Sequence, residues 1–381
     1  MVCSIAVAII FAEIGLRVWS PIPTDQLLPF PYNTERIRRI ADGNVSLGFD
    51  PDLGWRPTPD RVRRDDGVIY RNNHQGLRAD REYDQTPPLG VQRIAAFGDS
   101  FTYCAEVTQD DCWVAGLERA WAHTEFLNFG VPGYGPDQAW LRYQRDGRPL
   151  QPCAVLIGYY VEDIDRVVNR FRPFIDPADS VVMSKPRFLL DGDGLKLLPN
   201  PTTDPMQLGD PRRVEQLLGD HDTWYFPGTF TEGPLDDVSL FRLAKTAAYR
   251  QSRAALVRTI DRYPFYEQQG EAYQVTGRVL IEFAEQVRSD GATPVLVVFP
   301  GKRDLLTNQE GQPPYAPLLA WLGKAGVATI DLTDVMAEEV ERRGIDQVFA
   351  VTHYSSLGDR VVVEHLMRAL PSVVSTTCSP G

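Results

Sequence analysis

Residues 94–102, with the sequence IAAFGDSFT, decide how the rest of the chain is interpreted. An apolar run that ends in a turn predicts a buried strand. Gly98 lets the chain turn sharply, and Ser100 then lies at the carboxyl end of the strand, where open α/β sheets build their sites. A serine hydroxyl is a poor nucleophile until a base takes its proton, so a histidine must reach it. The alternative is a corner that uses Asp99 and Ser100 only as ordinary turn residues.

Other apolar runs repeat this strand pattern along the chain, and helical periods lie between several of them. The predicted strands cover 94–97, 124–130, 153–160, Thr293–Phe299 and 327–332, and the predicted helices cover 278–289, 315–325 and 333–343. Strands that alternate with helices indicate a parallel sheet with helices on both faces. We therefore expect an α/β fold with a doubly wound parallel sheet.

Four segments, in chain order, resemble the sequence blocks of the SGNH/GDSL hydrolase family. Ser100 stands in the first block, Gly133 takes the glycine position of the second, and His353 precedes a helical pattern as the histidine of the last block does. The third block, usually Gly-Asn-Asp, is here Val161-Glu162-Asp163. The resemblance covers roughly residues 91–165 and 275–370. It implies a flavodoxin-like three-layer fold with a long insertion, about 166–270, after the third strand.

The resemblance also implies a reaction. Ser100 would attack an ester, His353 would take its proton and later give it to the leaving group, and an acyl-serine would form. The oxyanion would need the backbone N–H groups of Ser100 and Gly133 and a side chain from the third block. Neither a metal nor an organic cofactor is expected, because this mechanism uses only protein groups.

Two positions depart from the family pattern. The family usually has an aspartate three residues before the histidine, but Ala350 stands there and Val351 follows it. His353 would then rely on a backbone carbonyl or on a distant acid, and Asp346 is the nearest upstream candidate. The second departure is Glu162, where the family has asparagine. Glu162 could be a protonated oxyanion donor, the missing partner of His353, or a mark of lost catalysis.

Three functions follow from this pattern. The first is a serine ester hydrolase, with a small-molecule or glycan ester, and an acylated carbohydrate above all, as its substrate. The second is a polysaccharide O-acyltransferase, in which a sugar hydroxyl replaces water. The third is a binding protein that keeps the SGNH fold without catalysis. The sequence does not specify the acyl group or the oligomeric state.

Composition excludes one class of partner and bears on the compartment. The formal net charge is −12, from 39 basic and 51 acidic residues, so nothing in the composition favours nucleic-acid binding. The cysteines have no metal-ligand spacing. Cys104 and Cys112 could form a disulfide outside the cytoplasm, although we expect buried free thiols.

The regions outside the sheet are expected to have three roles. Residues 1–19 are apolar and are predicted to be a membrane anchor, with the core or interfacial helix as the alternative. The catalytic domain, 91–370, would then be periplasmic or at the cell surface. Residues 20–90 are expected to pack on the core as short strands and turns, with substrate contact by Arg78 a minority view. The insertion is expected to cap the strand ends, with a hairpin turn at residues 191–194.

Overall fold

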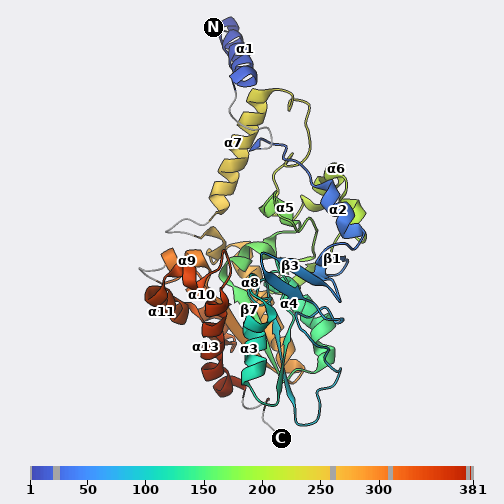
Figure 1. Ribbon diagram of the computed structural model, residues 1–381. Coiled ribbons are helices and arrows are strands. Elements are labelled where there is room, and N and C mark those ends of the chain that lie inside the picture. The colour runs from blue at the N-terminus through green and yellow to red at the C-terminus, as the bar shows by residue number, and fades with distance from the viewer. Residues whose placement is uncertain (1, 20–25, 258–262, 308–311, 375–377, 379–381) are drawn as a thin grey trace.

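A five-stranded parallel sheet forms the centre of the computed structural model, which describes all residues except 1, 20–25, 258–262, 308–311, 375–377 and 379–381 (Figure 1). Its strands are β5 (Gln92–Phe97), β6 (Thr124–Asn128), β7 (Ala154–Tyr160), β10 (Thr293–Phe299) and β11 (Ala328–Asp331). Their order across the sheet is β11-β10-β7-β5-β6, and every pair is parallel. Counted along the chain this is the 2-1-3-4-5 order of flavodoxin-like folds. The predicted doubly wound α/β fold is confirmed.

Helices cover both faces of the sheet because its strands bury side chains on both sides. In β5, Ile94 and Ala96 pack toward α3 (Trp113–Ala120), α11 (Thr333–Arg343) and α13 (Ser356–Val374). Ala95 and Phe97 point the other way, toward α4 (Pro136–Arg142), α8 (Glu271–Ser289) and α10 (Ala316–Lys324). This alternation is the period of two that a strand imposes on its side chains. The result is three layers.

The chain reverses direction across the sheet between β5 and β7. After β5 the chain runs outward to the edge strand β6, and it then returns to add β7 on the opposite side of β5. In open α/β sheets, such a switch point opens a crevice at the carboxyl ends of the strands. Ser100 follows β5, and Glu162 follows β7, so both residues lie at this edge.

The N-terminal extension contains one helix that the sequence analysis did not predict. Helix α2 (Thr34–Ala41) begins where the Asn33 side chain accepts a hydrogen bond from the Arg36 N–H (3.0 Å), and it buries Ile37 and Ile40. The helix has only 8 residues, too few to reveal a helical period. Two hairpins follow, made by β1 (Leu47–Asp50) with β2 (Gly54–Pro57) and by β3 (Val62–Asp65) with β4 (Val68–Arg71).

The insertion after β7 has several separate elements. It begins with η5 (Val161–Val168) and α5 (Arg172–Ile175), and its hairpin of β8 (Arg187–Asp191) and β9 (Gly194–Leu198) confirms the predicted turn. Helix α7 (Ser239–Leu256) stands above the sheet domain in Figure 1. The insertion also contains η6 (Pro205–Leu208), α6 (Pro211–Leu218) and η7 (Pro264–Tyr266). Short helices elsewhere in the chain are η2 (Gln109–Asp111), η3 (Tyr143–Gly147), η4 (Arg148–Leu150), α9 (Lys302–Thr307) and α12 (Ile345–Val348).

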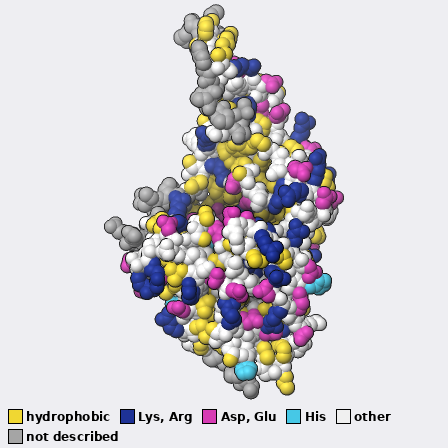
Figure 2. Space-filling view, in the orientation of Figure 1, with side chains coloured by type: hydrophobic (Ala, Val, Ile, Leu, Met, Phe, Trp, Pro, Cys, Tyr) yellow, Lys and Arg dark blue, Asp and Glu magenta, His cyan; other side chains and the backbone are white. Residues whose placement is uncertain are grey.

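Helix α1 (Val2–Trp19) lies beyond α7 at the top of the molecule (Figure 1). The Glu13 carboxylate accepts hydrogen bonds from the N–H groups of Ser239 and Leu240, both at 2.9 Å, and caps the start of α7. Apolar side chains are exposed along the helix: Val7, Ile9, Ile10, Phe11, Ile14 and Val18. Hydrophobic side chains are visible at the top of Figure 2. Among the helices described, none combines the length and the apolar character that crossing a membrane requires.

The expectation of free thiols is wrong. Disulfides join Cys104 to Cys112 and Cys153 to Cys378. The Cα atoms are 5.3 Å apart in the first pair and 5.4 Å apart in the second, within the range that a disulfide spans. Sequence spacing could not show this, because the approach of the cysteines depends on the turns after Ser100 and on where the last helix ends.

Candidate active site

A tight corner after β5 positions Ser100. A side chain at Gly98 would place its Cβ 2.3 Å from Thr102 Oγ1 and 2.8 Å from the carbonyl oxygen of Gly158, so the corner requires glycine. The Asp99 carboxylate accepts a hydrogen bond from the Phe101 N–H at 2.9 Å and closes the turn. Ser100 is buried, with 8% of its surface exposed.

His353 reaches Ser100 from the loop before α13. Its Nε2 lies 2.8 Å from Ser100 Oγ. The loop is held in place by the Ala350 N–H, which donates to the carbonyl of His353 (2.9 Å), and by the Tyr354 hydroxyl, which donates to the carbonyl of Pro300 after β10 (2.8 Å). The structure therefore brings together the two residues that the sequence analysis selected as nucleophile and base.

Glu106 is the acid that orients His353, and the sequence analysis missed it. Its Oε1 lies 2.9 Å from His353 Nδ1, so imidazole and carboxylate share a hydrogen bond. The same carboxylate accepts hydrogen bonds from the N–H groups of Val351 (2.7 Å) and Thr352 (3.1 Å) and from the Thr352 hydroxyl (2.7 Å). Partial burial acts to raise the pKa of Glu106, but the bonds from His353, Thr352 and Val351 outweigh it and hold the pKa well below its usual range.

Local backbone geometry places Glu106 where it meets the histidine loop. Its φ is +72°, in the left-handed region that non-glycine residues seldom adopt. The disulfide between Cys104 and Cys112 brackets the segment, and the Glu106 N–H donates to the Tyr70 hydroxyl of β4 at 2.9 Å. The only signal in the sequence was an acidic residue a few positions after Ser100, and the family resemblance directed attention to the segment before His353 instead.

The two acids proposed as partners of His353 lie elsewhere. Asp346 is exposed and pairs with Lys302 at 2.9 Å. Glu162 is the second residue of η5, and its charge and hydrogen bond help to raise the pKa of Tyr160, after the larger effect of burial. Because Glu106 holds Nδ1 of the imidazole and Ser100 faces Nε2, the proposals that Asp346 or Glu162 orients His353 are wrong. The role of Glu162 as an oxyanion donor stays a prediction.

Two backbone donors are available for an oxyanion. The N–H groups of Ser100 and Gly133 donate to no acceptor within the part of the chain that the structure describes. Gly133 has φ +82°, and the indole of Trp55 fixes its loop by donating to the carbonyl of Pro132 at 3.0 Å. The geometry therefore leaves free the two N–H groups that the predicted chemistry requires.

The largely covered guanidinium of Arg166, whose side chain is 13% exposed, connects the serine corner with the Gly133 loop. Arg166 Nη1 donates to the carbonyl of Tyr134 (2.7 Å) and to the carboxylate of Asp99 (3.2 Å), and it forms an ion pair with the carboxylate of Asp163 (2.5 Å). Burial raises the pKa of Asp163. The sequence analysis placed Asp163 in the third block but did not identify Arg166. This network fixes Ser100 and the oxyanion loop relative to each other.

Arg78 does not contact substrate, because only 1% of it is exposed. Its guanidinium donates to the carbonyl of Val107 (2.5 Å) and lies 4.7 Å from the centre of the Tyr103 ring. Arg78 thus supports the segment that carries Glu106.

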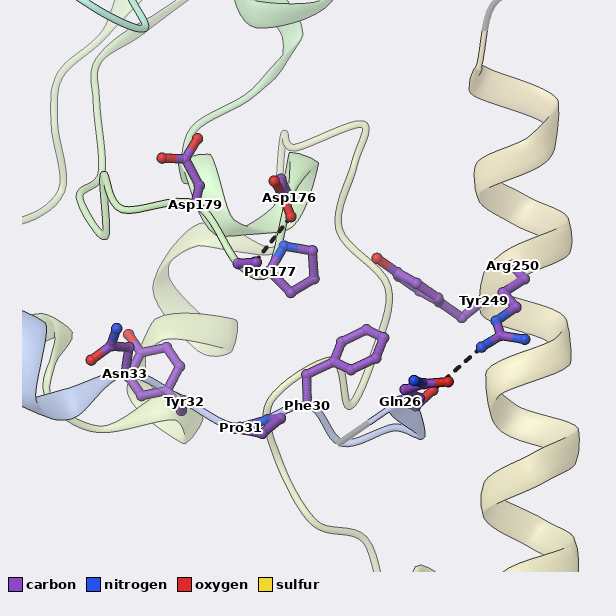
Figure 3. Close-up of a pocket in the computed structure, with 11 residues that line it drawn as sticks. Gln26, Phe30, Pro31, Tyr32, Asn33, Asp176, Pro177, Asp179, Tyr249 and Arg250 are labelled. Carbon is purple, nitrogen blue, oxygen red and sulfur yellow. Dashed lines mark hydrogen bonds between the residues drawn. The ribbon is translucent and has the colours of Figure 1, made fainter. Parts of the chain in front are cut away.

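A cavity of about 740 Å³ lies apart from Ser100, beside α7 (Figure 3). Three aromatic side chains line it, Phe30, Tyr32 and Tyr249, together with the polar side chains of Asp176 and Arg250. None of the described residues that line it is a serine, a cysteine or a histidine. A smaller cavity of about 340 Å³ is lined by Tyr103 and Pro132, which flank the site. Within the described residues, no cluster of histidine, cysteine, aspartate or glutamate side chains could hold a metal ion.

No model of a protein family and no curated protein matches this chain. Among solved structures, it is similar to a member of the lipolytic protein G-D-S-L family from Veillonella parvula DSM 2008, with 11% identity over 73% of this chain and 98% of that one and a TM-score of 0.38. An α/β hydrolase from the metagenome of Lake Arreo, Spain, has 12% identity over 76% and 97%, with a TM-score of 0.39. A catalytic mutant of an acetylxylan esterase from Geobacillus stearothermophilus has 12% identity over 73% and 93%, with a TM-score of 0.37.

Proposed function

We propose that this protein is a serine ester hydrolase that acts through an acyl-serine intermediate. The observation that carries the proposal is the chain of hydrogen bonds from Ser100 Oγ to His353 Nε2 (2.8 Å) and from His353 Nδ1 to Glu106 Oε1 (2.9 Å). A nucleophile in contact with a base that a third group orients is the arrangement that activates a hydroxyl.

In the proposed reaction, Ser100 Oγ bonds to the ester carbonyl carbon while its proton passes to His353 Nε2. Glu106 remains ionised and stabilises the imidazolium. The negative charge that develops on the carbonyl oxygen is stabilised by the N–H groups of Ser100 and Gly133. The tetrahedral intermediate then collapses, and the alcohol leaves with the proton from His353. Water then attacks the acyl carbon while His353 takes its proton, the bond to Ser100 Oγ breaks as His353 returns the proton to Oγ, and the acid is released.

The substrate that we propose is an acylated carbohydrate, handled outside the cytoplasm. Two disulfides support an oxidising compartment. An anchoring role for residues 1–19 remains part of the same proposal. Transfer of the acyl group to a sugar hydroxyl is the alternative, and it differs only in what attacks the acyl-serine.

A fluorophosphonate probe tests the nucleophile directly. We expect Ser100 to be labelled, and we expect Ser100→Ala to abolish labelling with little change in the melting temperature, because the hydroxyl makes few contacts besides that with His353. The control is Ser356→Ala, which removes a serine that bonds to Asp111 rather than to His353. Labelling that persists in Ser100→Ala would show that another residue is the nucleophile and would contradict the proposal. Absence of labelling in the wild type would favour a non-catalytic binding protein. Release of free acid, as opposed to acylated glycan, separates hydrolysis from transfer.

A further inference from the structure

Four arginines surround the cavity of about 340 Å³ beside the candidate active site. Arg36 and Arg39 come from α2, Arg63 lies in β3, and Arg61 is the residue before β3. The chain carries a formal net charge of −12, so such a concentration of positive charge contrasts with the molecule as a whole. Clefts lined by one sign of charge raise the local concentration of ligands of the opposite sign.

Most of this positive charge is not neutralised by neighbours. Arg36 donates to the carbonyl of Ser180 (3.0 Å), and Arg61 donates to the side-chain oxygen of Asn44 (3.1 Å). Within the described residues, Arg63 is the only one of the four arginines that forms an ion pair. Its partner is the exposed carboxylate of Asp65, at 3.2 Å. Burial lowers the pKa of Arg36, and the charges of Arg39 and Arg63 lower it further, which indicates that the guanidinium groups lie close together.

The cavity shares its wall with the catalytic loops. Pro132, in that wall, directly precedes Gly133, the candidate oxyanion donor. Tyr103, also in the wall, belongs to the turn of Ser100, since its N–H donates to the carbonyl of Asp99 at 2.9 Å. Asp179, whose charge acts on Arg36, is itself bound by Arg172 at 2.8 Å. A group bound among the arginines would therefore lie against the residue before Gly133 and against the turn that carries Ser100.

We propose that this cavity binds an anionic group of the substrate, so that the ester cleaved at Ser100 belongs to a negatively charged glycan. The inference rests on the proposed esterase function, and it names the substrate class. Guanidinium groups bind carboxylate, sulfate and phosphate oxygens through charge-assisted hydrogen bonds, and these ligands share that chemistry. Arg39 and Arg61 are the residues expected to contact the anion, because their donors are committed least to other protein groups.

The test compares two O-acetylated oligosaccharides of equal length, an oligouronate and a neutral xylo-oligosaccharide, by the rate of acetate release. We expect kcat/KM to be at least about tenfold higher for the oligouronate, since one charge-assisted contact is worth on the order of tenfold. The double variant Arg39→Gln, Arg61→Gln should lose most of this preference. Arg38→Gln is the matched control, because Arg38 lies on the same helix, pairs with Glu35 and does not line the cavity.

A binding measurement separates this proposal from the esterase proposal. Calorimetry with Ser100→Ala and deacetylated oligouronate should give binding that weakens with salt and that the double arginine variant loses. A sulfated oligosaccharide of the same length distinguishes a carboxylate ligand from a sulfate ligand. Acetate release without any preference for charge, together with no binding of either anionic glycan, would overturn the anion site and leave the esterase intact. Binding of the oligouronate without acetate release from any ester would leave the anion site and overturn the esterase.

Discussion

Glu106 connects two parts of the chain that are distant in sequence. Its carboxylate binds the N–H groups of residues 351–353 and the side chains of Thr352 and His353, and its own N–H donates to the hydroxyl of Tyr70 in the N-terminal extension. The acid of this site therefore approaches the histidine from the serine side of the fold rather than from the segment before the histidine. This arrangement explains why Ala350 can stand where the family resemblance predicts an aspartate.

Replacing Glu106 by glutamine is expected to lower kcat/KM by on the order of 10²–10⁴-fold, because the amide no longer stabilises the imidazolium. Asp346→Asn is the control and should leave activity unchanged, since Asp346 is exposed and contacts Lys302 instead. Ester hydrolysis by purified variants measures both effects. Equal losses in the two variants, or full activity of Glu106→Gln, would contradict the assigned role.

The same substitution should change the pH dependence of stability. The folded state holds the pKa of Glu106 below its unfolded value of about 4.3, so the ionised carboxylate stabilises the fold above that pH. This stabilisation is lost as the pH falls from about 4.3 toward the folded pKa. We expect Glu106→Gln to cost about 1.5–3 kcal/mol at neutral pH, the usual value of hydrogen bonds to a charged group. Denaturant unfolding should show that the difference shrinks in acid, whereas a constant difference would contradict this linkage.

Site residues next to a strand or helix with a clear sequence pattern were predictable from sequence, and site residues positioned by turn geometry were not. Ser100 and Gly133 follow apolar runs, and His353 precedes a helical period, so a pattern locates each of them. Glu106 and Arg166 have no such pattern. The position of Glu106 depends on a left-handed φ and a disulfide, and that of Arg166 on the packing of η5 against two loops.

At the scale of elements, the segment between β5 and α3 is a turn-rich loop closed by the Cys104–Cys112 disulfide. Asn128 lies against it, since its side-chain amide donates to the carbonyl of Thr102 at 2.8 Å. The loop contains little regular structure, so the covalent link restricts the positions that Glu106 can take. The strands of the central sheet were predictable within one or two residues, whereas α2 was too short and this loop too irregular to predict.

Removal of the Cys104–Cys112 disulfide is expected to lower activity by more than any loss of stability explains. In Cys104→Ala, Cys112→Ala, Glu106 should sample positions away from His353, and we expect kcat to fall by about tenfold or more, since small misplacements of this kind are costly. The matched control is Cys153→Ala, Cys378→Ala, which removes the link between β7 and the C-terminal segment, distant from Glu106. If the control loses as much activity as the first variant at equal stability, the loop is not what positions the acid.

At the scale of the molecule, the sheet domain carries the candidate site, while α1 and α7 form a separate projection above it (Figure 1). Nothing in the proposed reaction uses the projection directly. Helix α7 is held to the rest of the fold by its own hydrogen bonds, such as those from Arg242 to the carbonyl of Leu28 (2.8 Å) and from Arg253 to the carbonyl of Phe174 (2.7 Å), whereas the Glu13 cap joins α1 to the first turn of α7. A change at this cap should therefore affect the projection alone.

Glu13→Gln tests this independence of the two regions. Hydrogen bonds from the N–H of Leu240, then from Arg17 and the N–H of Ser239, lower the pKa of Glu13 to about 2, so the carboxylate caps α7 at neutral pH. The cap is present above the unfolded pKa of about 4.3 and is lost as the pH falls toward about 2. Hydrogen exchange of the first turn of α7 should accelerate in the variant at neutral pH, and the two proteins should converge near pH 2. Because the serine, histidine and acid all lie in the sheet domain, ester hydrolysis should be unchanged, and a loss of activity in Glu13→Gln would show that the projection is coupled to the site.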